Sequence, residues 1–596
     1  MFIAWIAWPS LSISPAAGID NDWAFALHAS FLGYWHGTPV TAFTYGPLGF
    51  LAVPAMWSRT TCALALTALF AVDAALAHVV VRRLTPTVPW WASAVAAYAV
   101  VRIQGTNIGE SAVLALALFA CDLILTEDVR RTRTTVAAIA CASGCLLLIK
   151  FSAGTTSLGI VIVLAATVLG SGWRMRLAAA VAATVTSLIS CWAVFSLVTL
   201  QPSQFIHWFR ASMSIAGGYG VLRFDAAQTG DRVEYVAMLL AGIALVAALA
   251  WRRHGLFSCS LIVGGVLYVK LREGFVRHDA DHMLIATAAL ACVGYMIPLT
   301  LRNRVFALVV SGSAVAMSYY IGGGASAFLH VYDGPSNAVR LADTMLSTHR
   351  SNEIEAQARA SMRDGYALSP SIVGALQGQT VHVDPWETSV VWAYTLKWRP
   401  IYVWASYVAY AHPLDQDNVS VLDDEHDAPQ RILRRREPPV VDGHIPDWES
   451  PGYEIALLCH YETIASDATW LVLARADHDL CGAEVPLGST IHAQARTRVA
   501  VPRPRNPNDL VVMHVQLHRR FSERVVTALY RSSSRLRVNF GLPRNPSTDP
   551  GTVVGPLLVG HGASTVMLDQ DQSVEFFDAG VTSYDITFAE IPFAGS

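Results

Sequence analysis

The sequence predicts a polytopic α-helical membrane protein, about 11 transmembrane helices followed by an exported α/β plus β-sandwich-like region. Of its 596 residues, 53% are hydrophobic and only 15% are charged, and the mean hydropathy is +0.40. Ordinary soluble domains carry more charge than this. The charge is also unevenly divided, because residues 1–321 hold 20 Lys and Arg against 13 Asp and Glu, whereas residues 322–596 hold 22 against 32. We therefore expect a lipid-embedded first part and a water-exposed second part.

Eleven hydrophobic runs are long enough for a transmembrane helix, which takes roughly 17–25 residues. They fall at about 2–18, within 48–81, and at 85–101, 110–126, 134–151, 153–170, 177–200, 234–251, 256–271, 282–301 and 304–321. The first run is short, contains Pro9 and Pro15 and lacks the basic start of a signal sequence. We therefore expect the true start codon to lie upstream.

Arginine clusters mark every second connection between these runs. The clusters are Arg82-Arg83, Arg130-Arg131 with Arg133, Arg174 with Arg176, Arg252-Arg253, and Arg302 with Arg304. Because basic residues are retained on the cytoplasmic side, these five loops are predicted to be cytoplasmic. It follows that the N-terminus is inside and that everything after residue 321 is outside, in the cytoplasmic membrane of a bacterium.

Three domains are expected: a transmembrane domain at 1–321, an extracytoplasmic α/β domain at 322–490 and an extracytoplasmic β-rich module at 491–596. Residues 333–365 have apolar positions at helical spacing. Residues 387–396 are predicted as a helix, and 380–384, 401–404, 454–460 and 469–474 as strands. In the last module, strands are expected at 510–517, 525–530, 536–540 and 573–577.

The cysteines fit the predicted orientation. Seven of the nine lie within the hydrophobic runs, where a thiol is a small apolar side chain. Cys459 and Cys481 are the two in the exported region, where a disulfide can persist. A bridge between them is the prediction, and two free thiols are the alternative.

The first outer connection has the most informative sequence. Asp20 and Asp22 follow the first run, Gly33-Tyr34-Trp35 and Pro39 come next, and Tyr45-Gly46-Pro47-Leu48 leads into the second run. Carboxylates at this boundary are exposed enough to ionise and close enough to reach a lipid headgroup. The alternative interpretation is that Asp20 or Asp22 caps a surface helix starting near Trp23.

This connection resembles the first outer loop of the GT-C superfamily, whose members are integral membrane glycosyltransferases that use polyprenyl-phosphate sugars. The protein O-mannosyltransferases and aminoarabinose transferases belong to this group. The residues that carry the resemblance are Asp20, Gly33, Trp35, Pro39, Tyr45, Pro47 and Leu48. Tyr45 stands one residue closer to Pro47 than in the family, Asn21 replaces a common Glu, and Gly46 replaces a Lys. The Tyr-Gly-Pro-Leu-Gly-Phe string also resembles a group of multi-pass bacterial proteins.

The resemblance implies inverting sugar transfer with the loop carboxylate as general base. A carboxylate that takes the proton of a sugar hydroxyl accelerates attack by a factor on the order of 10²–10⁴. The predicted base is Asp20, with Asp22 in reserve. A lipid-phosphate leaving group also needs cations on the same face, and the candidates are Arg277, Arg272, Lys270 and Lys150.

Alternatives remain for the ionisable run at 270–282. Arg272 could pair with Glu273, and Arg277 with Asp279 or Asp281, since charges at membrane depth are usually paired or functional. A divalent-metal site is the other reading, with His278, Asp279, Asp281 and His282 as ligands; apart from it, no cofactor is implied. Tyr45, His278, His207 and Arg210 are the candidate substrate-binding residues, and an interfacial aromatic belt explains His207 and its neighbours equally well.

The sequence thus predicts a glycosyltransferase that moves a sugar from a polyprenyl-phosphate donor to an envelope glycan, lipid or protein on the outer face. The alternatives are an envelope-lipid transporter or flippase and a noncatalytic subunit of a polysaccharide assembly complex. Nucleic acid is excluded as a partner, because Arg434-Arg435-Arg436 is the longest basic tract.

Overall fold

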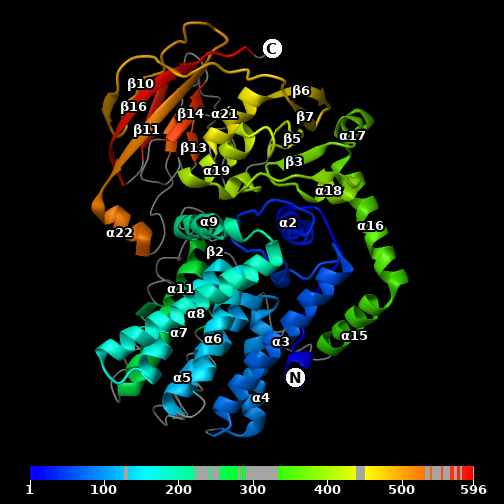
Figure 1. Cartoon of the computed structure of the whole chain (residues 1–596), viewed down its shortest axis with the longest axis vertical. Helices are drawn as coiled ribbons and strands as arrows, with labels where there is room; N and C mark the ends of the chain where they lie inside the picture. Colours follow the sequence, from blue (N-terminus) through cyan, green and yellow to red (C-terminus); the bar gives the residue numbers. More distant parts are fainter. Residues whose placement is uncertain are drawn as a thin grey trace.

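The computed structural model describes residues 1–86, 88–126, 132–219, 254–278, 333–437, 450–529 and 580–594. Shorter described stretches are 224–225, 239–240, 243, 282, 285–286, 289, 537–539, 552–554, 564–568 and 573–577. Figure 1 shows a bundle of long helices at one end of the molecule and the β-sheets at the other, with α2 (Ile19–Tyr34) and α9 (Phe205–Gly218) between them.

Four helices in the described part of the chain are long and apolar enough to cross a membrane: α3 (Arg59–Leu84), α5 (Ile108–Thr126), α7 (Phe151–Leu169) and α8 (Trp173–Thr199). The chain is therefore a multi-pass membrane protein. The shorter apolar helix α6 (Thr132–Ile149) corresponds to one more predicted span, and α4 (Trp90–Gln104) and α11 (His254–Val276) lie at two others. The predicted spans at 234–251, 282–301 and 304–321 fall almost entirely outside the described residues, as do Arg130, Arg131, Arg252, Arg253, Arg302 and Arg304.

The predicted span at 2–18 is wrong as a continuous helix. Helix α1 covers only Phe2–Ile6, and no helix continues from it through residues 8–17. Pro9 and Pro15 lack the backbone N–H that a helix interior needs, which accounts for the interruption. The next helix, α2, begins at Ile19, so Asp20 and Asp22 lie in its first turn.

The helices have differently charged ends. Arg82 and Arg83, at the end of α3, pair with Asp122 of α5. At the opposite end of α5, Glu110 pairs with Lys150, which joins α6 to α7. Lys150 pairs with Tyr45, which stacks on Trp23 of α2, so this end lies next to the helix that separates the bundle from the sheets (Figure 1).

The first sheet is mixed and has the order β4-β3-β5-β7-β6. Strands β4 (Lys397–Trp398) and β5 (Arg431–Arg435) run parallel to β3 (Thr380–Asp384), whereas β7 (Trp470–Arg475) is antiparallel to both β5 and β6 (Tyr461–Ser466). Around it lie α16 (Thr348–Tyr366), α17 (Pro370–Leu376), α18 (Ser389–Tyr394), α19 (His412–Asp423) and α21 (Pro451–His460). Helix α15 (Asp333–Leu346) instead packs against α1 and the start of α3 (Figure 1).

Two further sheets form a sandwich. One contains β14 (Ser564–Leu568), β11 (Leu510–Arg519), β16 (Val581–Ile591), β8 (Val485–Pro486) and β9 (Ile491–Gln494). The other has the order β10 (Val499–Ala500), β15 (Ser573–Phe577), β12 (Arg537–Asn539) and β13 (Thr552–Val554). Met513 and Tyr584, in the sandwich sheet that contains β11, share a buried core with Val574 and Phe576, in the sheet that contains β15.

Three predicted strands are wrong. Residues 454–460 lie in helix α21, because Pro451 occupies its first turn and Asp415 accepts hydrogen bonds from the N–H groups of Gly452 and Tyr453. Residues 525–530 overlap helix α22 (Phe521–Leu529). Residues 401–404 form no strand. The Asn418 side chain accepts a hydrogen bond from the N–H of Val403 and donates one to its carbonyl, so it makes the hydrogen bonds that a neighbouring strand would otherwise make.

Candidate functional site

The segment around Tyr45 is fixed against the junction of α6 and α7. Leu48 donates its N–H to the carbonyl of Leu148 (2.9 Å), Phe151 donates to Thr44 (3.3 Å), and Tyr45 forms an antiparallel β-bridge with Lys150. A Cβ at Gly46 would lie 2.6 Å from the Leu148 carbonyl oxygen, so a side chain has no room there. The close approach of these two backbones brings the first outer connection to Lys150.

A line of side chains leads from Asp20 to Lys150. Asp20 Oδ1 accepts a hydrogen bond from Trp23 Nε1 (3.0 Å), and the Trp23 ring stacks on Tyr45 with 5.0 Å between centroids and 10° between planes. The Nζ atom of Lys150 lies 6.0 Å from the centre of the Tyr45 ring. Asp20 is exposed, so its carboxylate can meet a ligand.

Lys150 belongs to a cluster that we call the Lys–Glu quartet, composed of Glu110, Lys150, Lys270 and Glu273. Lys150 Nζ lies 2.9 Å from Glu110 and 2.6 Å from Glu273. Lys270 contacts the same two carboxylates, with 2.9 Å to Glu273. The side chains of Lys270 and Glu110 are 1% exposed, so the quartet is largely dehydrated and its two positive and two negative charges balance.

Arg277 lies at the end of α11, where Arg277–His278 (β2) pairs in parallel with Phe224–Asp225 (β1). Its charge acts on Tyr219, the residue that follows α9. Burial raises the pKa of the Tyr219 hydroxyl, Glu273 raises it further, and Arg277 and Lys150 oppose the rise. Arg277 also follows Glu273 of the quartet by four residues, about one helical turn, at the end of α11. Arg272 is partly buried on the same helix, and both Arg272 and Arg277 engage other groups of the protein.

Tyr45 stands between the two ends of the site. Burial raises the pKa of its hydroxyl, and the positive charge of Lys150 opposes that rise. The carboxylates of Glu273, Glu110 and Asp20 raise the pKa further. The charges of both the quartet and Asp20 thus act on the Tyr45 hydroxyl. The structure brings together five of the predicted site residues: Asp20, Tyr45, Lys150, Lys270 and Arg277.

Asp22 has a different environment from Asp20. It is fully buried, and its carboxylate accepts hydrogen bonds from the N–H groups of Gly18 (3.0 Å) and Ser389 (2.7 Å) and from the hydroxyl of Tyr366 (3.1 Å). Burial raises the pKa of Asp22 to about 7, against these hydrogen bonds. The geometry favours a structural role, joining α2 to α18, over the reserve role as general base.

The predicted acceptor residues His207 and Arg210 lie on α9. His207 Nε2 is 3.4 Å from Asp417 of α19, and its ring lies 4.5 Å from that of Tyr402. Arg210 is exposed on the same helix. His207 thus joins α9 to the α/β region, and neither residue contacts the quartet by any interaction described here.

Most of the predicted metal site falls outside the described residues. Asp279 and Asp281 lie there, as does the side chain of His278. His282 is described and partly buried, and it interacts with another group of the protein. Within the ranges that the structure describes, no three His, Cys, Asp or Glu side chains are placed to hold a metal ion.

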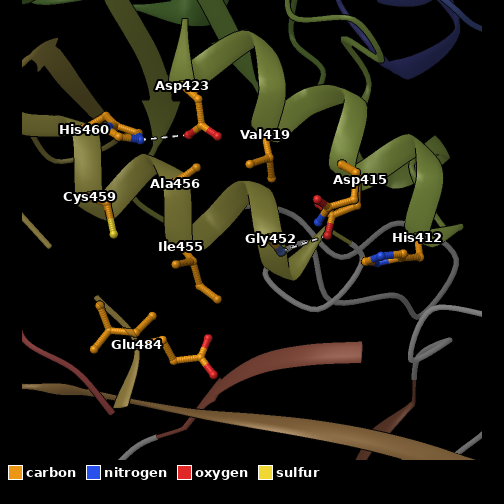
Figure 2. Close-up of a pocket in the computed structure, with 12 residues that line it drawn as sticks. His412, Asp415, Val419, Asp423, Gly452, Ile455, Ala456, Cys459, His460 and Glu484 are labelled. Atoms are coloured by element: carbon orange, nitrogen blue, oxygen red, sulfur yellow. Dashed lines mark hydrogen bonds and ion pairs between the residues drawn. The ribbon is translucent and has the colours of Figure 1, made fainter. Parts of the chain in front are cut away.

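A separate cavity of about 250 Å³ lies between α19, α21 and the sandwich (Figure 2). His460 on its wall contacts Asp423 through Nε2 (2.9 Å) and Asp479 through Nδ1 (2.8 Å). Cys459, also on the wall, is joined to Cys481 by a disulfide. The predicted catalytic and phosphate-binding residues do not line this cavity.

Sequence reasoning missed Glu110, although the sequence holds a signal for it. Glu110 is the only carboxylate between Asp73 and Asp122, and it opens an apolar run at the end where a span meets water. An isolated carboxylate in that position needs a cationic partner. Ser389 and Tyr366, the partners of Asp22, carried no such signal.

No protein-family model and no curated protein matches the chain. Among solved structures, the chain is similar to ArnT from Cupriavidus metallidurans in its apo state. The sequences are 13% identical, the match covers 80% of this chain and 96% of that chain, and the TM-score is 0.32. The sequence identity and the TM-score are both low.

Proposed function

We propose that the chain is a GT-C-type membrane glycosyltransferase, which moves a sugar from a polyprenyl-phosphate donor to a cell-envelope acceptor on the outer face. The observation that carries the proposal is the placement of Asp20. An exposed carboxylate, fixed by Trp23, lies in the region that also contains Lys150 and Arg277. A base and cations close together are what transfer from a lipid phosphate requires.

Asp20 acts in this proposal as the general base. It takes the proton from an acceptor hydroxyl as the oxygen attacks the anomeric carbon of the donor sugar. The bond between that carbon and the phosphate oxygen breaks, and polyprenyl phosphate leaves with the bonding electron pair. The Trp23 indole N–H holds one oxygen of the carboxylate, which leaves the other to receive the proton. Attack opposite the leaving group inverts the anomeric configuration.

Arg277 is the preferred residue for the donor phosphate. Lys150 and Lys270 each contact both glutamates of the quartet. Their role is to hold α5, the α6–α7 junction and α11 in register beneath the phosphate. Arg277 follows α11 at the sheet-facing end, and a guanidinium can bind two phosphate oxygens at once.

The test is donor binding and turnover by purified variants with a panel of polyprenyl-phosphate sugars. Asp20→Asn preserves size but cannot accept the proton, so it should bind donor normally and lose transfer by a factor on the order of 10²–10⁴. The matched control is Asp364→Asn, an exposed carboxylate on α16, which should keep wild-type turnover. Full turnover by Asp20→Asn would remove the proposed base.

Arg277→Ala separates phosphate binding from catalysis. Loss of a charge-assisted hydrogen bond should weaken donor binding by about 1.5–3 kcal/mol and affect turnover at saturating donor much less. Unchanged donor affinity would contradict the assignment. If the wild-type protein moves the lipid across the bilayer without transferring its sugar, the transporter alternative is correct.

A further inference from the structure

Helix α22 (Phe521–Leu529) presents an apolar face that the described residues leave uncovered. Phe521, Val525 and Leu529 are 79%, 37% and 57% exposed. Their spacing of four places them along one side of the helix. The exposed side chains of Arg520, just before the helix, and Arg524 flank this stripe, and with Glu523 they give residues 520–529 a net charge of +1. Such a combination is typical of helices that lie in a membrane interface.

The position of α22 brings this face to the membrane helices. Tyr268 of α11 donates its hydroxyl to the carbonyl of Leu529 (2.6 Å). Phe257 and Leu261 are 58% and 50% exposed on α11, and helical spacing places Tyr268 on the same side as these two residues. Among the described residues this side of the predicted span 256–271 is exposed, as a lipid-facing side would be. The hydrogen bond therefore joins α22 to a lipid-facing surface.

The depth of the contact follows from helix geometry. Tyr268 lies eight residues before Val276, the last residue of α11 on the sheet side, and eight residues of helix span about 12 Å. The C-terminal end of α22 thus lies alongside the span rather than above it. Figure 1 shows α22 at the level of α9, well below the strands of the sandwich from which it descends.

We propose that α22 lies in the leaflet nearest the sheets, with Phe521, Val525 and Leu529 among the acyl chains and Arg520 and Arg524 on anionic headgroups. The sandwich then rests on the bilayer through this helix. The proposal does not depend on the sugar-transfer reaction, because it concerns a surface remote from Asp20.

The test uses the full-length protein in liposomes with a photoreactive benzoylphenylalanine in place of Phe521. The liposomes contain labelled phosphatidylglycerol in phosphatidylcholine. The matched control carries the same probe in place of Ile464, which is 48% exposed on β6 in the first sheet. Position 521 should form a lipid adduct on irradiation, and position 464 should form none. Equal labelling at both positions, or an adduct at 521 only with protein, would overturn the proposal.

The headgroup preference has its own test. Replacing Arg520 and Arg524 by Gln should lower the phosphatidylglycerol adduct at position 521 by up to about fivefold per arginine. Labelled phosphatidylcholine, in liposomes of that lipid alone, should give a weaker adduct that the two substitutions do not change. An anionic-lipid adduct unaffected by both substitutions would overturn the assignment of the arginines to headgroups.

Discussion

Asp20 and Asp22 are separated by one residue and lie in the same turn of α2, yet one is exposed and the other is fully buried. The difference comes from the start of α18, where Thr388 and Ser389 donate hydrogen bonds to Asp22. The sequence could indicate that both carboxylates stand at a boundary. It could not separate their roles, because Ser389, which binds Asp22, is 367 residues away.

The burial of Asp22 predicts a pH-dependent stability. Burial raises the pKa of Asp22 to about 7, whereas an Asp in an unfolded chain titrates near 3.9. The folded state therefore holds this proton more tightly, and the stabilisation is lost as pH rises from about 4 to about 7. Asp22→Asn should reduce the fall in melting temperature between pH 5 and pH 8, whereas Asp364→Asn should keep the wild-type fall. Parallel curves for all three proteins would refute the prediction.

The Lys–Glu quartet predicts a large difference between two Glu→Gln substitutions. Glu110→Gln removes one of the two carboxylates that contact Lys270, whose side chain is 1% exposed. We expect it to lower the free energy of unfolding by about 3–5 kcal/mol. The control, Glu353→Gln, removes an exposed pairing with His349 and should cost less than about 1 kcal/mol. Denaturant unfolding of the detergent-solubilised proteins compares them. Similar losses of unfolding free energy in the two variants would mean that Glu110 interacts with the lysines of the quartet more weakly than the short distances indicate.

At the scale of elements, sequence patterns succeeded where an element has a clear period. The strands at 380–384 and 469–474 and the helical segment at 333–365 are confirmed, the last as two helices broken at Ser347. The patterns failed for short apolar runs that suit either structure. Residues 454–460 are helical because of a proline in the first turn, and residues 525–529 because of an apolar spacing of four; both features outweigh β propensity.

The contact between residues 44–48 and 148–151 predicts a specific glycine requirement. Gly46→Ala places a Cβ 2.6 Å from the Leu148 carbonyl oxygen, so the backbones must separate and Tyr45 must move from Lys150. We expect lower stability and lost activity. The control, Gly159→Ala in α7, meets no atom within 4 Å and should be neutral or stabilising. Thermal unfolding and donor turnover of both variants check this, and equal behaviour would contradict the close approach.

For the whole molecule, the sidedness of the membrane remains a prediction from the arginine clusters. The structure gives it a geometric counterpart, since Arg82 and Arg83 lie in the last turn of α3 and pair with Asp122, at the end of α5 opposite to Glu110. Reporter fusions after Arg131 and Arg253 should be cytoplasmic, and fusions after Gly220 and Gly365 should be exported. An exported reporter at Arg253 would reverse the orientation of α11 and with it the side on which Arg277 acts.

The general arrangement could be predicted from sequence because hydropathy and charge are summed over many residues. The candidate site could be predicted only in part. Asp20 and Tyr45 belong to one local motif, whereas the pairing of Lys150 with Glu273 joins residues 123 positions apart. Contacts at such separations leave no periodic pattern in a single sequence.

The bonds between Asp22 and α18 also constrain how the protein is made. Residue 22 leaves the ribosome hundreds of residues before Ser389, so its carboxylate has no backbone donor from α18 while the membrane helices are inserted. The first outer connection can reach its final conformation only after the second half of the chain has been synthesised and has crossed the bilayer. The candidate site therefore matures only after the second half of the chain has been exported. A nascent chain that has inserted its membrane helices still lacks the hydrogen bonds from α18 that hold α2 in place.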